Sequence, residues 1–152
     1  MEWELPAHGW APRPHVHPHL TEEYEVLDGS LEVLVGRERR ELTTGDAVSV
    51  PPGSVHTFRT GDKPTRVRNI HRPALDFERY ILRLCKAANQ HDLGDLNNLR
   101  SLLCIAVLVR EFPEHSRAPG RLLNAAVPTL AAVGRMLGFR TTCRDSAPVA
   151  TR

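Results

Sequence analysis

The chain has 152 residues, a formal net charge of +2 at pH 7 and a hydrophobic content of 41%. This length allows one compact domain, or a small barrel with an added helical unit. The densest basic cluster, Arg37 to Arg40, is interrupted by Glu38, which argues against a nucleic-acid surface. The N-terminus lacks a cationic start followed by an apolar core, and no apolar run could cross a bilayer. We therefore expect a cytoplasmic protein without a membrane partner.

The first half of the chain consists of short apolar stretches separated by Gly, Asp and Pro residues, a pattern typical of β-strands. Alternation along each stretch directs every second side chain to one face. Short connections such as Asp28-Gly29-Ser30 favour pairing between sequence neighbours, so a meander is expected. The predicted strands are 3–5, 23–28, 31–35, 39–42, 47–50, 56–60 and 65–70. The predicted interior residues are Tyr24, Val26, Leu31, Val33, Val35 and Phe58.

Two histidines, His15 and His17, are spaced so that they can bind one metal ion. Side chains two residues apart on a strand project from the same face, and Pro14 and Pro18 bracket the pair on a short edge segment. Glu22 begins the next strand close to where the pair ends. Two neutral imidazoles and a carboxylate suit iron, manganese, nickel, copper or zinc. This segment therefore predicts part of a site for one divalent transition metal.

A further donor, His56, comes from a distant part of the predicted sheet. It follows a strand and a Pro51-Pro52-Gly53 turn, and it opens a strand on which Phe58 and Thr60 share its face. A third imidazole is therefore available to the same metal.

These motifs resemble those of the cupin superfamily. The first family motif, G-x5-H-x-H-x(3,4)-E-x6-G, is matched by Gly9, His15, His17, Glu22 and Gly29. The second, G-x5-P-x-G-x2-H-x3-N, is matched by Gly45, Pro51, Gly53 and His56, with Thr60 in place of the final Asn. The resemblance implies a mainly β fold, a cupin barrel (double-stranded β-helix, jelly-roll-like) over residues 1–72. It also implies that His15, His17, Glu22 and His56 are the metal ligands.

Several other residues are candidates for chemistry or for substrate contact. Glu22 could leave the metal and accept a proton, and Tyr24 shares its face, so these two are the candidate catalytic residues. The candidate substrate contacts are Phe58, Thr60, Val26 and Val33. We expect His8, His19 and His71 on the surface, although the end of the last strand also allows His71 or Asn69 to line the mouth of the pocket.

From Pro73 onward the spacing of apolar residues becomes that of a helix. Three helices are predicted, over 74–89, 96–112 and 124–137. The second contains eight consecutive apolar residues, LLCIAVLV, and should be buried on several sides. Pro128 is placed near the start of the third helix. Cys85, Cys104 and Cys143 are expected to be buried thiols. Residues 73–140 thus form a C-terminal helical segment, and 141–152 are expected to be a disordered tail.

The resemblance implies a range of activities, and three hypotheses of different kinds remain open. The first is a metal-dependent oxidoreductase of the dioxygenase type, acting on a hydroxy-keto or phenolic compound. The second is a non-redox cyclase or isomerase in which the metal polarises a carbonyl. The third is a small-molecule sensor or binding module. A small-molecule substrate and a homodimer are expected, with the helices either roofing the barrel or forming the dimer interface.

Overall fold

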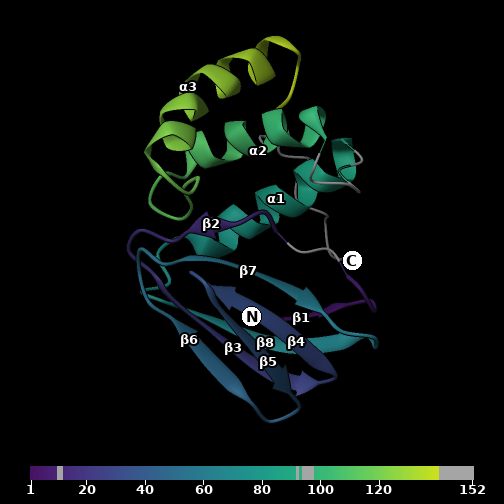
Figure 1. Ribbon diagram of the computed structural model, residues 1–152. Helices are drawn as coiled ribbons and strands as arrows, with labels where there is room; N and C mark the ends of the chain where they lie inside the picture. The colour runs from purple at the N-terminus through teal and green to yellow at the C-terminus, as the bar shows by residue number, and fades with distance from the viewer. Residues whose placement is uncertain (10–11, 92, 94–97, 141–152) are drawn as a thin grey trace, which may run out of the picture.

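Two antiparallel sheets make up the N-terminal half of the molecule (Figure 1). The computed structural model describes residues 1–9, 12–91, 93 and 98–140. Its strands are β1 (Glu2–Leu5), β2 (His15–Val16), β3 (Thr21–Asp28), β4 (Ser30–Val35), β5 (Glu38–Thr43), β6 (Ala47–Val50), β7 (Val55–Thr60) and β8 (Thr65–Arg72). Within the described residues they form two four-stranded sheets, in the orders β1-β8-β3-β6 and β2-β7-β4-β5. The predicted mainly β, jelly-roll-like barrel is confirmed.

The predicted meander is wrong, because the chain changes sheet between most successive strands. β3 pairs with β6 and β8, while β4 pairs with β5 and β7, so β4–β5 is the one local hairpin among the described strands. Changing sheets lets two apolar faces pack against each other, which a single flat meander does not achieve. Gly29 marks one such change, with φ 89°. A Cβ there would lie 2.6 Å from the carbonyl oxygen of Pro64, so only glycine fits.

The apolar core of the barrel lies between the two sheets. All six predicted interior residues belong to it or pack against it, because period-two alternation directs them inward. Its buried members are Tyr24, Val26, Leu31, Val33, Leu42, Val48, Val50 and Val67, with Trp3, Val35 and Phe58 packed against them.

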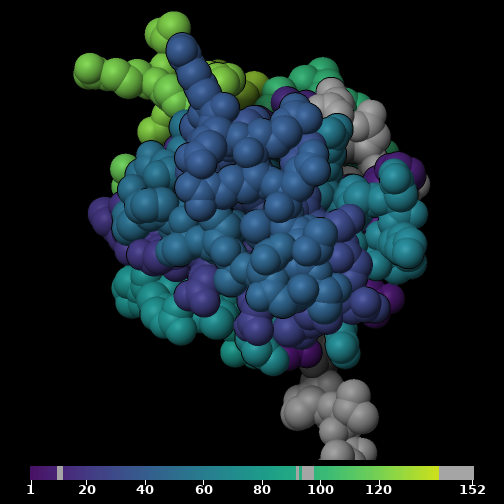
Figure 2. Space-filling model, turned by 60° about the horizontal axis from the view of Figure 1, so that its bottom comes forward, coloured from purple at the N-terminus to yellow at the C-terminus, as the bar shows by residue number. Residues whose placement is uncertain are grey.

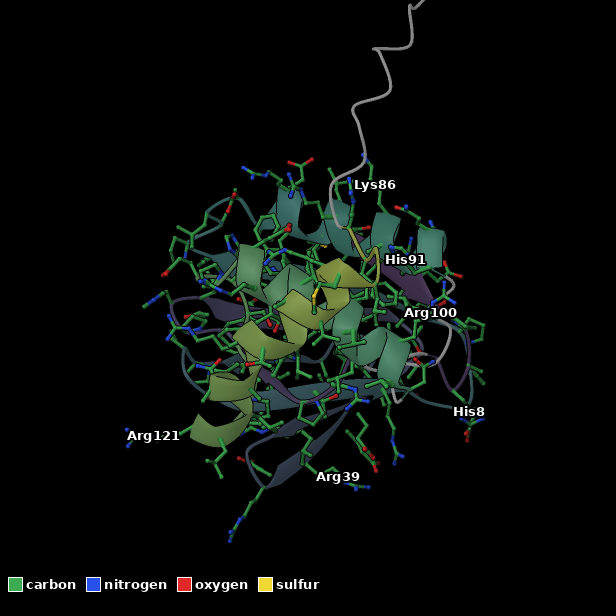
Figure 3. The ribbon with its side chains drawn as sticks, turned by 90° about the horizontal axis from the view of Figure 1, so that it is seen from above. His8, Arg39, Lys86, His91, Arg100 and Arg121 are labelled. Carbon is green, nitrogen blue, oxygen red and sulfur yellow. The ribbon has the colours of Figure 1, made fainter. Side chains whose placement is uncertain are left out.

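Three helices stack on one end of the barrel (Figure 1). They are α1 (Phe77–His91), α2 (Leu99–Glu111) and α3 (Arg121–Met136). In order from the barrel come α1, α2 and α3, and Figure 3 shows them from the helical side. Residues of all three helices share one apolar cluster, with Leu103, Cys104 and Val107 of α2 buried in it. As predicted, the apolar run is therefore buried on more than one side.

Some details of the helical segment differ from the predictions. α3 begins at Arg121, directly after Gly120, so Pro128 lies in the helix interior and not near its start. Cys104 is buried, but the prediction for Cys85 is wrong, because this thiol is on an exposed part of α1. Cys143 and the predicted disordered tail lie outside the described residues. None of the described helices has both the length and the apolar character that a membrane span requires.

A second apolar cluster joins the helices to the barrel. Leu20, which immediately precedes β3, is fully buried against Phe77, Tyr80, Leu108 and Phe112 from the helical segment. The helices therefore cover the end of the barrel at which β2 lies and β3 begins. Figure 2 shows the opposite end of the barrel. Most of the surface visible there is blue and belongs to the middle part of the barrel's sequence.

Candidate metal centre

Four side chains converge at the end of the barrel that the helices cover. His15 lies in β2, His17 follows it directly, Glu22 lies in β3 and His56 in β7. β2 pairs with β7 so that His15 stands opposite His56, and their ring centroids are 4.3 Å apart. One donor atom from each of the four residues lies within 4.8 Å of the others. Both sheets thus contribute to a single cluster of possible ligands.

The position of the proton on each of the three imidazoles is fixed by a backbone carbonyl. His15 Nδ1 lies 3.0 Å from the carbonyl oxygen of Arg13, and His56 Nδ1 lies 2.9 Å from that of Ser54. His17 Nδ1 faces the carbonyl oxygen of His115. A carbonyl oxygen can only accept, so each Nδ1 donates, and each neutral ring carries its lone pair on Nε2. The rings are therefore oriented as metal-binding histidines usually are.

The carboxylate of Glu22 lies among these rings. Its Oε2 is 2.7 Å from His56 Nε2 and 3.3 Å from His17 Nε2. Burial by itself raises the pKa of Glu22, but the imidazoles of His17, His56 and His71 outweigh burial and hold this pKa well below its usual value. Glu22 is therefore ionised at neutral pH.

The two histidines on β2 and β7 have pKa values shifted in opposite directions. Burial and the neighbouring His56 and His17 lower the pKa of His15 to about 3, so this ring is neutral. Burial also lowers the pKa of His56, but the nearby negative charge of Glu22 outweighs burial and raises this pKa above its ordinary value. A metal ion therefore competes with a proton for His56.

The donor set fits a divalent transition metal. Three neutral imidazoles and one carboxylate suit iron, manganese, nickel, copper or zinc. Glu22 Oε2 and His56 Nε2 are fully buried, yet neither makes a well-formed hydrogen bond despite their 2.7 Å separation. A buried polar atom without a partner is costly, and an ion shared by the two atoms would satisfy both.

Two residues of β8 hold the other oxygen of Glu22. β8 pairs with β3 so that His71 stands opposite Glu22. Asn69 Nδ2 donates to Glu22 Oε1 at 3.0 Å, and His71 Nε2 lies 3.1 Å from the same oxygen. The expectation that His71 lies on the surface is wrong, since only 8% of it is exposed. β8 extends to Arg72, and continued alternation from Val67 through Asn69 would have indicated an inward His71.

The helical segment contacts the cluster directly. The ring of Phe77 stacks on His71, with centroids 3.5 Å apart and an interplanar angle of 22°. The same phenyl ring meets His17 edge to face, with centroids 5.7 Å apart. His115, in the connection between α2 and α3, supplies the carbonyl oxygen for His17. Nothing in the local sequence around Phe77 or His115 indicated these contacts, because they depend on how the helices pack on the barrel.

Tyr24, the second candidate catalytic residue, lies in the barrel core next to Glu22. Its hydroxyl group is buried and makes no well-formed hydrogen bond among the described residues. Burial and the negative charge of Glu22 raise the pKa of Tyr24 well above 10. The hydroxyl is therefore protonated at neutral pH and can donate a hydrogen bond, but it cannot act as a base there.

The four candidate substrate contacts pack against protein atoms in this structure. Val26 and Val33 are 1% and 0% exposed within the barrel core. Phe58 stacks on Trp3, with ring centroids 5.1 Å apart. The hydroxyl of Thr60 donates to the carbonyl oxygen of Pro6 at 2.7 Å and accepts from Gly9 N at 2.6 Å. Contact of these residues with a substrate stays a prediction.

His8 and His19 lie on the surface, as expected. The side chain of His8 is 76% exposed, and Figure 3 shows it at the periphery. His19 Nε2 lies 2.9 Å from a carboxylate oxygen of Glu114, and both side chains are more than half exposed. Neither histidine belongs to the cluster.

Two surface depressions lie away from the cluster. One, of about 230 Å³, lies between the end of α2, the connection that follows it and α3. The other, of about 720 Å³, is lined by residues that include Gly9, Ser30, Glu41 and Thr60. Neither is lined by any of the four possible ligands, so both are separate from the candidate metal centre.

The first half of the chain matches known proteins. Residues 1–71 match the family described as Cupin domain. Quercetin 2,3-dioxygenase of Bacillus subtilis (strain 168) is 40% identical over 53 residues, which are 35% of this chain and only 16% of that protein. This chain thus spans a small part of that relative's length.

Solved structures with a similar arrangement include TT1209 from Thermus thermophilus, with 28% identity and a TM-score of 0.43, covering 46% of this chain and 67% of that one. KdgF from Halomonas sp. has 26% identity and a TM-score of 0.41, covering 43% and 59%. A cupin protein (BF4112) from Bacteroides fragilis has 25% identity and a TM-score of 0.42, covering 46% and 60%. Together with the two motifs, the family match shows that residues 1–71 form a cupin domain.

Proposed function

We propose that this protein is a metal-dependent cupin oxidoreductase of the dioxygenase type, acting on a small hydroxy-keto or phenolic compound. One observation carries the metal part of this proposal. Donor atoms of His15, His17, Glu22 and His56, from both sheets, lie within 4.8 Å of one another. The dioxygenase part is supported by the 40% identity over 53 residues to a protein named quercetin 2,3-dioxygenase.

In this proposal the Nε2 atoms of the three histidines and Oε2 of Glu22 hold one divalent ion. A bound divalent metal supplies a Lewis acid, and a redox-active one also supplies electrons for reaction with dioxygen. The protein contributes orientation, because the backbone carbonyl groups and Asn69 and His71 fix the four side chains.

Two residues of β3 would handle protons. Glu22 is ionised, and when it is released from the metal its Oε2 could accept a proton from a substrate hydroxyl group or an acidic C–H. Tyr24 is protonated and its buried hydroxyl has no well-formed hydrogen bond among the described residues, so it can donate one to a substrate oxygen. Phe77 and Tyr80 cover this end of the barrel and exclude water from it.

A second candidate, a metal-loaded binding module without catalysis, is favoured by the closure of the site. His17, Glu22 and His56 are only 3%, 4% and 1% exposed. Phe77 lies over His71 and His17, and the nearby valines of the barrel are packed. A ligand could be held in such a site without being turned over.

Metal analysis followed by oxygen uptake tests the proposal. The protein is purified without chelator, its metal is measured by mass spectrometry, and oxygen consumption is followed with a panel of phenols and diketones. Iron, nickel, copper or manganese with oxygen consumption supports the dioxygenase. Zinc with anaerobic turnover favours a non-redox cyclase or isomerase, and bound metal without turnover favours the binding module. Absence of bound metal would overturn all three.

The same samples test the expected homodimer. α3 exposes large apolar side chains, with Leu122 90% and Met136 79% exposed, and a second copy of the chain would cover them. Light scattering on the wild type and on Leu122→Glu should give twofold different masses if α3 forms the dimer interface. Equal masses would contradict an interface at α3.

A further inference from the structure

We propose that the helical segment, which lies outside the cupin domain, contributes to the metal centre by positioning two of the four ligands, His17 and Glu22. This inference rests on the proposed metal site. It concerns contacts from residues beyond the match to the cupin family, which ends at residue 71.

The first contact acts on Glu22 through His71. Asn69 Nδ2 and His71 Nε2 both bond Oε1 of Glu22, at 3.0 and 3.1 Å. With Oε1 engaged in this way, Oε2 is the oxygen left to face the imidazoles of His17 and His56. The carboxylate is thereby restricted to binding a metal through one oxygen.

Phe77 fixes the ring of His71. The two rings are stacked with centroids 3.5 Å apart, at an angle of 22°. Phe77 opens α1 and is itself buried in the apolar cluster with Tyr80, Leu108 and Phe112. Packing of the helices on the barrel therefore determines where the His71 ring lies, and His71 in turn orients Glu22.

The second contact acts on His17 through the connection between α2 and α3. The carbonyl oxygen of His115 accepts from His17 Nδ1. Two backbone hydrogen bonds, of 3.0 and 2.9 Å, join Val16 and Arg117 in an antiparallel bridge. Oδ1 of Asp76, which immediately precedes α1, lies 2.7 Å from His115 Nε2. This contact links the connection to the first helix.

The bridge matters because β2 has only two residues and pairs with a single strand, β7. So short an edge strand gains few backbone hydrogen bonds of its own. The Val16–Arg117 bridge gives its other edge a partner next to both His15 and His17. The ligand-bearing segment is therefore held between the barrel and the helical segment.

Substitutions that spare the ligands test this inference in the full-length protein. Phe77→Leu removes the ring that stacks on His71, and His71→Ala removes the bond to Glu22, whereas His71→Gln keeps a donor. Leu108→Val is the matched control. Leu108 lies in the same apolar cluster as Phe77 but has no aromatic ring that could stack on His71 or meet His17. The readouts are the dissociation constants for Co²⁺ and Zn²⁺ in competition with a chelator, and the visible spectrum of the Co²⁺ form.

We expect Phe77→Leu and His71→Ala to weaken metal binding by about 10- to 100-fold and to shift the Co²⁺ bands. His71→Gln should recover part of the affinity, and Leu108→Val should bind like wild type. Unchanged affinity and spectrum in folded Phe77→Leu and His71→Ala, or equal losses in Leu108→Val, would overturn this inference alone. A wild-type protein that binds neither metal would overturn the metal centre and this inference with it.

Discussion

The carbonyl oxygen of His115 accepts a hydrogen bond from Nδ1 of His17, although 98 residues separate the two in the sequence. This bond fixes the lone pair of His17 on Nε2, the atom nearest Glu22. A residue of the helical segment thereby sets the tautomer of a side chain in the cupin domain. The candidate metal centre consequently combines both parts of the chain.

Loss of one imidazole should abolish tight metal binding. In His56→Ala we expect affinity for Zn²⁺ or Co²⁺ to fall by more than about 100-fold, beyond the effect of losing a residue that only supports a ligand. The metal retained after dialysis measures this. His8→Ala is the control, because His8 is exposed and lies outside the cluster. Metal content in His56→Ala equal to that of wild type would remove His56 from the ligand set.

Metal binding should release a proton and weaken in acid. The pKa of His56 lies above 6.5 in the metal-free protein because of Glu22, so His56 is protonated below this pKa and neutral above it. Affinity should therefore rise as the pH increases through that pKa. His15, with a pKa of about 3, adds no dependence near neutrality.

Calorimetry in two buffers with different ionisation enthalpies checks this. More protons should be released from His56 per metal ion bound at pH 6 than at pH 8.5. Binding that is equally strong and releases no proton at either pH would contradict the assigned state of His56.

The contact between the helices and the barrel should contribute strongly to stability. Leu108 is 1% exposed in the cluster that includes Leu20 of the barrel. Leu108→Ala should lower the free energy of unfolding by about 2–5 kcal/mol, because it leaves a cavity. Lys86→Ala, at an exposed position of α1, should change it by less than about 0.5 kcal/mol. Urea unfolding measures both, and similar values for the two variants would show that the helices pack loosely.

Thr60 should act in folding through its hydroxyl group. Thr60→Val leaves Gly9 N and the carbonyl oxygen of Pro6 without their partner, at a position that is 3% exposed. We expect a loss of about 1–3 kcal/mol in the free energy of unfolding, with unchanged metal content. Thr44→Val, at an exposed turn, serves as the control. Full stability together with an impaired KM for substrate would instead favour a direct substrate contact.

Sequence patterns predicted the strands and their faces well, because alternation reflects burial directly. Tyr24, Val26 and Val33 point inward as expected. The sheet partners were predicted wrongly, since short turns such as that at Gly29 are compatible either with a hairpin or with a change of sheet. His71 was missed because the last strand was ended too early.

The sequence by itself indicated which four side chains could meet, through the resemblance of its two motifs to those of cupins, and it determined which strand faces are apolar. The apolar faces are a local property, because they depend on residue type and on a period of two. Only the tertiary structure decided that Asn69 and His71 hold Glu22, and that Phe77 and His115 contact the cluster. Such contacts join segments far apart in the chain, and they arise from the packing of apolar helix faces on the barrel, which no local pattern specifies.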